Sequence, residues 1–194
     1  DATLGGGQSS YQVGYLNEDC QFSGLAKCVR LTKVGTGKLT LRTPGHTAPM
    51  TVNGGTLELS NTTSTLFTSA LITVNNGGTL SGNALAGNVT VNKGGTITGG
   101  INGLAGTLRL QGNLTFSSGS TLRCLLTTTS NTKVSVGGNI RHNGDTILVV
   151  VPASRQLSVG DEIEVFSGGT QTGEFVVKVE AEGASYELDD YTLL

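Results

Sequence analysis

Apolar and polar residues alternate in short runs through the middle of the chain, and glycine interrupts every run. The apolar members of these runs are Met50, Val52, Leu57, Leu59, Ile72, Val74, Val89, Val91, Leu108, Leu110, Val134 and Val136. Alternation of this kind turns one row of side chains inward and the next outward, as in a half-buried β-strand. No stretch has the 3.6-residue period of an amphipathic helix. The pattern therefore predicts an all-β protein.

A recurring phrase, Thr-Val-Asn-Gly-Gly-Thr-Leu and its variants, joins the predicted strands. Clear copies occupy residues 51–57, 73–80 and 90–97, and weaker copies occupy residues 115–122 and 135–140. The copies therefore start at positions 51, 73, 90, 115 and 135, in steps that are similar but unequal. A period of about 20 residues is typical of solenoids, in which each unit buries its apolar face against its neighbours.

Two arrangements fit the phrase. Asn53-Gly54 between alternating runs is a strong signal for a β-hairpin, which would give an antiparallel sandwich. Alternatively, each Asn-Gly-Gly is the corner of a coil, and successive coils stack in parallel. The second and third copies contain one extra residue, Asn76 and Lys93, which would slip the register of a tight hairpin. We therefore favour a right-handed parallel β-helix with a strand-rich C-terminal cap.

Within one continuous domain we expect three parts: N-terminal strands or a cap over residues 1–30, the β-helix over 31–150, and an acidic β cap over 151–194. The apolar run 147–151 should supply the last buried strand, covered by the charged strands from residue 161. Residues 1–160 carry 11 Lys/Arg and 5 Asp/Glu, whereas residues 161–194 carry 9 Asp/Glu and one Lys. Because these acids alternate with apolar residues, we interpret them as the solvated face of strands.

Two adjacent segments resemble a known repeat. LTKVGTGKLTL at residues 31–41 and MTVNGGTLEL at residues 50–59 resemble the autotransporter-associated β-strand repeat of bacterial autotransporter passengers and large surface proteins of Bacteroidetes. The resemblance covers roughly residues 31–150, and residues 157–169 are similar to segments that close such arrays. It implies a β-helix, export to the cell surface or secretion, and flanking domains as partners. The repeat brings no catalytic residues.

Composition excludes several classes of partner. The net charge of −2 gives no reason to expect nucleic acid. Tryptophan is absent and aromatics make up 5% of residues, which argues against an aromatic platform for sugars or single strands. No apolar run approaches the length of a membrane-spanning helix. The chain starts at Asp1 and its one methionine is Met50, so we expect a fragment or a processed product.

An enzyme acting on polysaccharide needs paired carboxylates or acids that hold a cation beside a base. Residues 43–105 contain only two charged side chains, Glu58 and Lys93, so catalysis there is not expected. Asp189-Asp190 lacks the surrounding ligand loop of a Ca²⁺ site.

Other candidates are scattered. Glu18-Asp19 could bind a cation, but we favour an exposed turn before a strand as the explanation of this pair. His46 and His142 lie in predicted turns without a serine or cysteine nucleophile nearby, so we expect them to be solvated. We assign no catalytic, cofactor-binding or metal-binding residue.

The three cysteines do not have the spacing of a metal site. Cys20 and Cys28 are predicted to form a disulfide in an exported protein, with two buried thiols as the alternative. Cys124 alternates with Leu122 and Leu126 and should be a buried free thiol.

These expectations lead to one function with two alternatives. The sequence favours a non-catalytic structural stalk or adhesin-type module of a secreted bacterial surface protein, with no cofactor. Its partners would be the flanking domains and also glycans or a host surface. The first alternative is a glycan-binding module, and the second is a polysaccharide lyase or hydrolase or an ancillary domain of one.

Overall fold

The described part of the chain is built from short β-strands. The structure is a computed structural model that describes residues 3–4, 9–46, 48–61, 67, 70–152, 162–181 and 184–187. Within these residues no segment is helical, which confirms the all-β prediction.

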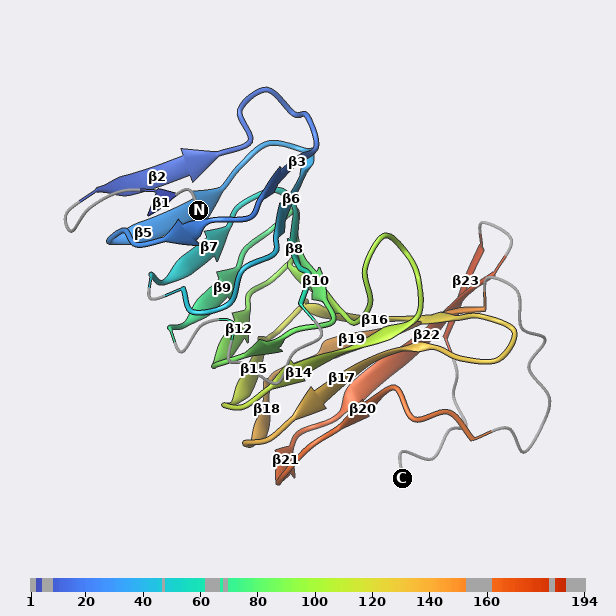
Figure 1. The fold of residues 1–194 in the computed structure, drawn as a ribbon. Coiled ribbons are helices and arrows are strands. Elements are labelled where there is room, and N and C mark those ends of the chain that lie inside the picture. Colours follow the sequence, from blue (N-terminus) through green and yellow to red (C-terminus); the bar gives the residue numbers. More distant parts are fainter. Residues whose placement is uncertain are drawn as a thin grey trace.

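Two long sheets and a shorter third sheet run along the molecule, and the chain visits them in turn (Figure 1). The first sheet contains β2 (Ser10–Val13), β5 (Arg30–Lys33), β7 (Met50–Val52), β9 (Ile72–Val74), β12 (Val89–Val91), β15 (Leu114–Ser117), β18 (Ile140–Asn143) and β21 (Gln171–Thr172). The second contains β3 (Cys20–Phe22), β6 (Lys38–Leu41), β8 (Gly55–Leu59), β10 (Gly78–Gly82), β13 (Thr96–Thr98), β16 (Thr121–Leu126), β19 (Thr146–Pro152), β22 (Phe175–Ala181) and β23 (Ala184–Glu187). The third contains β11 (Leu85–Ala86), β14 (Gly106–Leu110), β17 (Thr132–Val136) and β20 (Phe166–Ser167).

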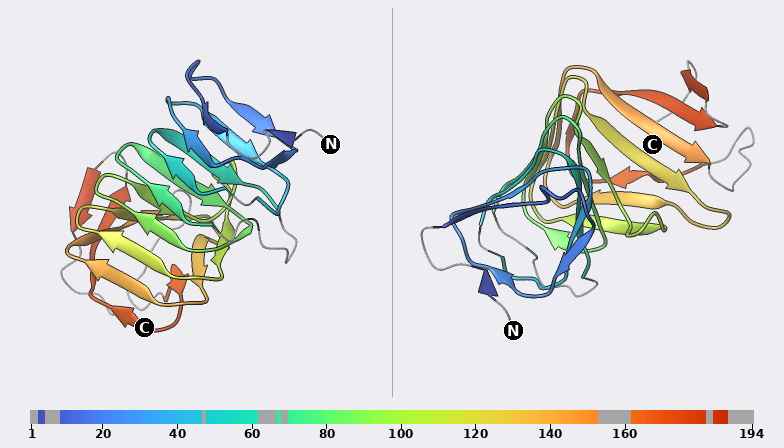
Figure 2. Two further views of the ribbon diagram at one scale, coloured as in Figure 1. Left: turned by 90° about the vertical axis from the view of Figure 1, so that its left-hand side faces the viewer. Right: turned by 90° about the horizontal axis from the view of Figure 1, so that it is seen from above.

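Each coil contributes one strand to the first sheet and the next to the second sheet, and from β9 to β20 a further strand to the third sheet. Figure 2 shows the coils stacked on one another along the molecule. Neighbouring strands in all three sheets are parallel, apart from the antiparallel pair β22–β23. The chain is therefore a parallel β-helix, and the hairpin alternative is wrong. A small fourth sheet pairs β1 (Thr3–Leu4) with β4 (Leu25–Ala26) near the N-terminal end.

The first four copies of the phrase stack in register. Thr51, Thr73, Thr90 and Thr115 are consecutive partners in the first sheet. The next partner in this column is Arg141. Ser135, which was predicted to start the fifth copy, lies instead in β17 of the third sheet, where it pairs with Arg109 and Ser167. The prediction for this copy was wrong because the coil makes an additional strand before it returns to the first sheet.

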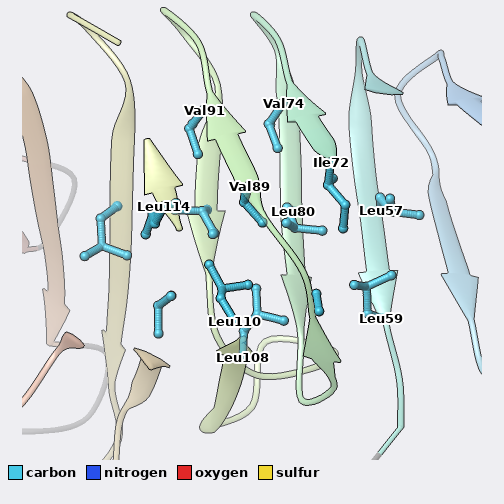
Figure 3. Close-up of a cluster of buried hydrophobic side chains, with 14 of the residues drawn as sticks. Leu57, Leu59, Ile72, Val74, Leu80, Val89, Val91, Leu108, Leu110 and Leu114 are labelled. Carbon is cyan, nitrogen blue, oxygen red and sulfur yellow. The ribbon is translucent and has the colours of Figure 1, made fainter. Parts of the chain in front are cut away.

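The core is a set of apolar columns between the sheets (Figure 3). In the second sheet, the column Leu57, Leu80, Ile97, Leu122 and Leu148 has no member more than 2% exposed. In the first sheet, Val52, Val74, Val91 and Phe116 are fully buried. Each such side chain contributes about 1.5–3 kcal/mol of burial free energy, so stacking rather than local propensity stabilises the coils.

Parallel pairing continues on both sides of residues 31–150. On the N-terminal side β2 pairs with β5. On the C-terminal side β22 pairs with β19 and buries Phe175 and Val177, so the run 147–151 is not the last buried strand. The hairpin strand β23 then covers the edge of β22. The charged C-terminal strands thus continue the second sheet and close its edge.

Candidate functional site

The outer surface of the two long sheets carries columns of threonine. One column in the first sheet comprises Thr51, Thr73, Thr90 and Thr115, and one in the second comprises Thr56, Thr79, Thr96 and Thr121. All eight side chains are partly exposed. Strands in a sheet lie about 4.8 Å apart, so each column repeats a hydroxyl at that spacing.

An asparagine ladder runs along the corner between these two columns. The Asn75 Nδ2 donates to the Asn53 Oδ1 at 2.7 Å, and the Asn92 Nδ2 donates to the Asn75 Oδ1 at 2.7 Å. The Ser117 hydroxyl continues the ladder by donating to the Asn92 Oδ1 at 3.2 Å. The asparagine of the phrase therefore joins coil to coil.

Lys33 is buried at the equivalent corner of an earlier coil. Its side chain is 1% exposed, and its Nζ donates to the carbonyl oxygens of Val34, Gly35 and Gly54 at 2.7, 3.2 and 3.1 Å. Burial lowers the pKa of this amine, although Cys20 and Asp19 oppose the shift. Because the three carbonyls bind the ammonium group, Lys33 closes this corner and is not free to contact a substrate.

A second polar cluster lies on the outer face of the second sheet. Glu58 is 2% exposed, and Asn102, from the connection after β13, lies against its carboxylate. One carboxylate oxygen, Oε1, accepts from the Thr40 hydroxyl at 3.1 Å, and the other, Oε2, accepts from the Asn102 N–H at 2.8 Å and lies 3.7 Å from the Lys38 Nζ. The Lys38 Nζ also donates to the Asn102 Oδ1. In the sequence Glu58 is one of only two charged residues between positions 43 and 105, whereas in the structure it has three polar neighbours.

Both histidines were expected to be solvated, and this expectation was wrong. His46 is 2% exposed and stacks on Phe67 with ring centroids 4.9 Å apart. His142 lies in β18, stacks on Phe116 at 5.2 Å and meets Phe175 edge-on at 4.4 Å. The aromatic partners come from other coils, so no local pattern reveals them. Burial lowers the pKa of both imidazoles, which suits packing better than proton transfer.

All three cysteines are free thiols in the structure, which differs from the predicted Cys20–Cys28 disulfide. Cys20 is exposed on β3, whereas Cys28 is buried against the core of the first coils. Cys124 is a buried free thiol, as predicted, and burial raises its pKa to about 11.

Glu18-Asp19 does not form a cation site. The Asp19 Oδ1 accepts the backbone N–H of Lys38 at 2.7 Å, and Glu18 is exposed. Among the described residues, no cluster of three or more His, Cys, Asp or Glu could hold a metal ion. Asp189-Asp190 lies outside the described residues.

The described acidic residues near the C-terminus act as an outer face of the last coils. Glu162, Glu164 and Glu174 are exposed, as the alternation predicted. Ion pairs join Glu164 to Lys133 at 2.5 Å and Glu180 to Arg123 at 2.9 Å. The Glu164 pair joins successive coils, whereas the Glu180 pair reaches across β19 to join β22 to β16.

The chain matches no protein-family model, and no curated protein matches it. In the part of the chain that the structure describes, no helix is long and apolar enough to span a membrane.

Proposed function

We propose that this chain is a non-catalytic structural stalk or adhesin-type module of an exported bacterial surface protein, similar to passengers built from autotransporter-associated repeats. The proposal rests on one observation: the repeated residues join each coil to the next. Asn53, Asn75 and Asn92 hydrogen-bond to one another along the helix axis, and the apolar residues beside them fill the core. The repeat therefore builds a rigid rod, which suits distance-keeping between flanking domains.

Rigidity is testable with two fluorophores at opposite ends. Leu16 and Val176 are exposed, at 85% and 38%, so Leu16→Cys and Val176→Cys can be labelled in a Cys20→Ser background. A stalk gives one narrow distance distribution that stays unchanged up to the unfolding transition in denaturant. A broad distribution under native conditions would argue against the proposal.

The threonine columns favour glycan binding as a second candidate. Their evenly spaced, partly exposed hydroxyls can hydrogen-bond a sugar chain, although the columns themselves contain no aromatic side chain to strengthen the contact. A glycan array probed with the intact chain and with a Thr73→Val, Thr90→Val variant separates the two functions. Binding that the variant loses would establish a glycan-binding face, and the absence of binding favours the stalk.

The same sample tests the enzymatic alternative. Incubation with pectins, xylans and host glycans should release no reducing or unsaturated sugar. Release that is abolished by Glu58→Ala, or by joint replacement of Glu18 and Asp19 with alanine, would replace the stalk proposal with a hydrolase or lyase.

A further inference from the structure

Three residues far apart in the sequence converge on the outer face of the second sheet. Lys38 lies on β6, Glu58 lies on β8, and Asn102 lies in the connection after β13. Strands β6, β8, β10 and β13 are consecutive neighbours in this sheet, so the connection after β13 reaches back across β10 to meet the two earlier strands. The cluster thus joins separate coils, and its two most distant members, Lys38 and Asn102, are 64 residues apart in the sequence.

The chemical types of these groups are complementary. Lys38 carries a primary amine, a nucleophile once it loses its proton. The Asn102 side chain carries an acyl carbon, and its Oδ1 is already hydrogen-bonded to the Lys38 Nζ. Glu58 is a general acid–base group, 3.7 Å from the same Nζ. The amine, the acyl carbon and the proton carrier therefore stand together.

The surroundings hold this arrangement in place. The Thr40 hydroxyl and the Asn102 N–H each occupy one carboxylate oxygen of Glu58. Asn102 has a φ of 52°, a left-handed conformation that asparagine tolerates better than most residues. The side chain of Glu58 is 3% exposed and that of Lys38 is 25% exposed. Because the reacting groups are already held together, the reaction avoids the entropy loss of a bimolecular step.

We propose that Lys38 and Asn102 form an intramolecular isopeptide bond, with Glu58 as the catalytic acid–base residue. Glu58 accepts a proton from the Lys38 ammonium, and the neutral Nζ attacks the Asn102 Cγ. Glu58 returns this proton to the amide nitrogen Nδ2, the Cγ–Nδ2 bond breaks, and ammonia leaves. Glu58 then takes the extra proton from the new Nζ–Cγ amide and passes it to the ammonia. The products are one amide and one ammonium ion, and no oxidant or reductant is needed.

A competing reaction also starts from Asn102. Because Gly103 follows it, the backbone nitrogen of Gly103 could attack the same Cγ and form a succinimide, which likewise releases one ammonia. Intact mass alone cannot separate the two products. Their connectivity differs, since only the isopeptide bond joins two distant segments of the chain.

The test is mass spectrometry of the purified chain after unfolding and tryptic digestion. The isopeptide blocks cleavage after Lys38, so we expect a branched product in which residues 34–42 are joined to residues 94–109, lighter than the sum by one ammonia. A chain at full sequence mass with separate peptides would overturn the proposal. So would loss of ammonia confined to a linear 94–109 peptide, which is the succinimide.

Variants test the assigned roles. Glu58→Gln keeps the shape of the side chain but cannot carry the proton, so this variant should give no branched peptide while its circular dichroism matches the parent. Lys38→Arg removes the nucleophile and should also stay uncrosslinked. The control Asn76→Ala changes an exposed asparagine that also precedes glycine and should cross-link fully. Should Glu58→Gln fail to fold, the Lys38→Arg and Asn76→Ala pair still decides whether the bond forms. Cross-linking in folded Glu58→Gln at the parent rate would overturn the role of Glu58.

Discussion

Lys33 and Val52 are register partners on β5 and β7, so a lysine occupies the inner column that valine fills in the next coil. The aliphatic part of Lys33 replaces the valine in the core, while its Nζ turns to three backbone carbonyls at the corner. A buried charge is tolerated here because every donor direction meets an acceptor.

Replacing Lys33 with methionine tests this corner. Lys33→Met keeps the straight apolar chain and removes the donor, which leaves three carbonyls with one partner fewer. We expect the free energy of unfolding to fall by about 2–4 kcal/mol, measured by urea denaturation. The exposed Lys27 gives a matched control, Lys27→Met, which should change stability by less than about 0.5 kcal/mol. Equal effects of the two variants would contradict the structural role of the Lys33 ammonium.

Two corner glycines should respond differently to alanine. Gly55 has a φ of 60°, and a Cβ there would lie 2.4 Å from the Gly37 carbonyl oxygen. Gly77 has a φ of 75° but no atom within 4 Å of the added carbon. Gly77→Ala should therefore cost only the backbone strain, about 1 kcal/mol, and Gly55→Ala about 3 kcal/mol or more because backbone must also move. Thermal unfolding of both variants checks this ranking, and the opposite order would contradict the corner geometry.

The asparagine ladder predicts a graded effect along its length. Asn75 donates to one neighbour and accepts from another, whereas Asn53, at the end of the ladder, only accepts. At about 1 kcal/mol for each net hydrogen bond, Asn75→Ala should destabilise the protein about twice as much as Asn53→Ala. Chemical denaturation measures both. Equal small effects would show that the ladder does not stabilise the stack.

The stability of the protein should depend on pH through His142. Burial lowers its pKa in the folded state, and both ring nitrogens are buried without a hydrogen-bond partner among the described residues. The unfolded chain, with a histidine pKa of about 6.5, therefore binds more protons below that pH. Stability should fall as the pH drops from about 6.5 towards the lowered folded pKa.

Replacement of His142 by phenylalanine removes the titratable imidazole and keeps an aromatic ring between Phe116 and Phe175. We expect His142→Phe to flatten the decline in thermal midpoint between about pH 6.5 and 5. The remaining slope should come in part from His46, whose pKa burial also lowers. An unchanged pH profile in His142→Phe would contradict this assignment.

The thiols should differ in reactivity. Cys20 is exposed, whereas Cys28 and Cys124 are buried and have raised pKa values. Because the thiolate is the reactive form, iodoacetamide should label one cysteine in the native protein at pH 8 and all three after unfolding. Failure of Cys20 to react, together with a mass lower by two protons, would instead establish the disulfide that the sequence suggested.

The architecture was predictable because the same local pattern of alternating residues and glycine-rich corners recurs along the chain. The extra residues Asn76 and Lys93 distinguished coil corners from hairpins, and alternation identified the inward columns. The copy at Ser135 was misplaced because its local pattern resembles the others, while its sheet depends on the length of the preceding connection. The environments of Glu58 and His142 were unpredictable for a related reason. Their neighbours, Asn102 for one and Phe116 and Phe175 for the other, come from other coils.

The unequal steps of the stack have an evolutionary consequence. The register partners of one column fall at positions 51, 73, 90, 115 and 141, yet the first and second sheets stay aligned because the connections beyond the second sheet absorb the difference. Duplication or deletion of one coil of about 20 residues would therefore lengthen or shorten the rod by about 4.8 Å. The length of such a protein can therefore change during evolution while the packing of its core stays the same.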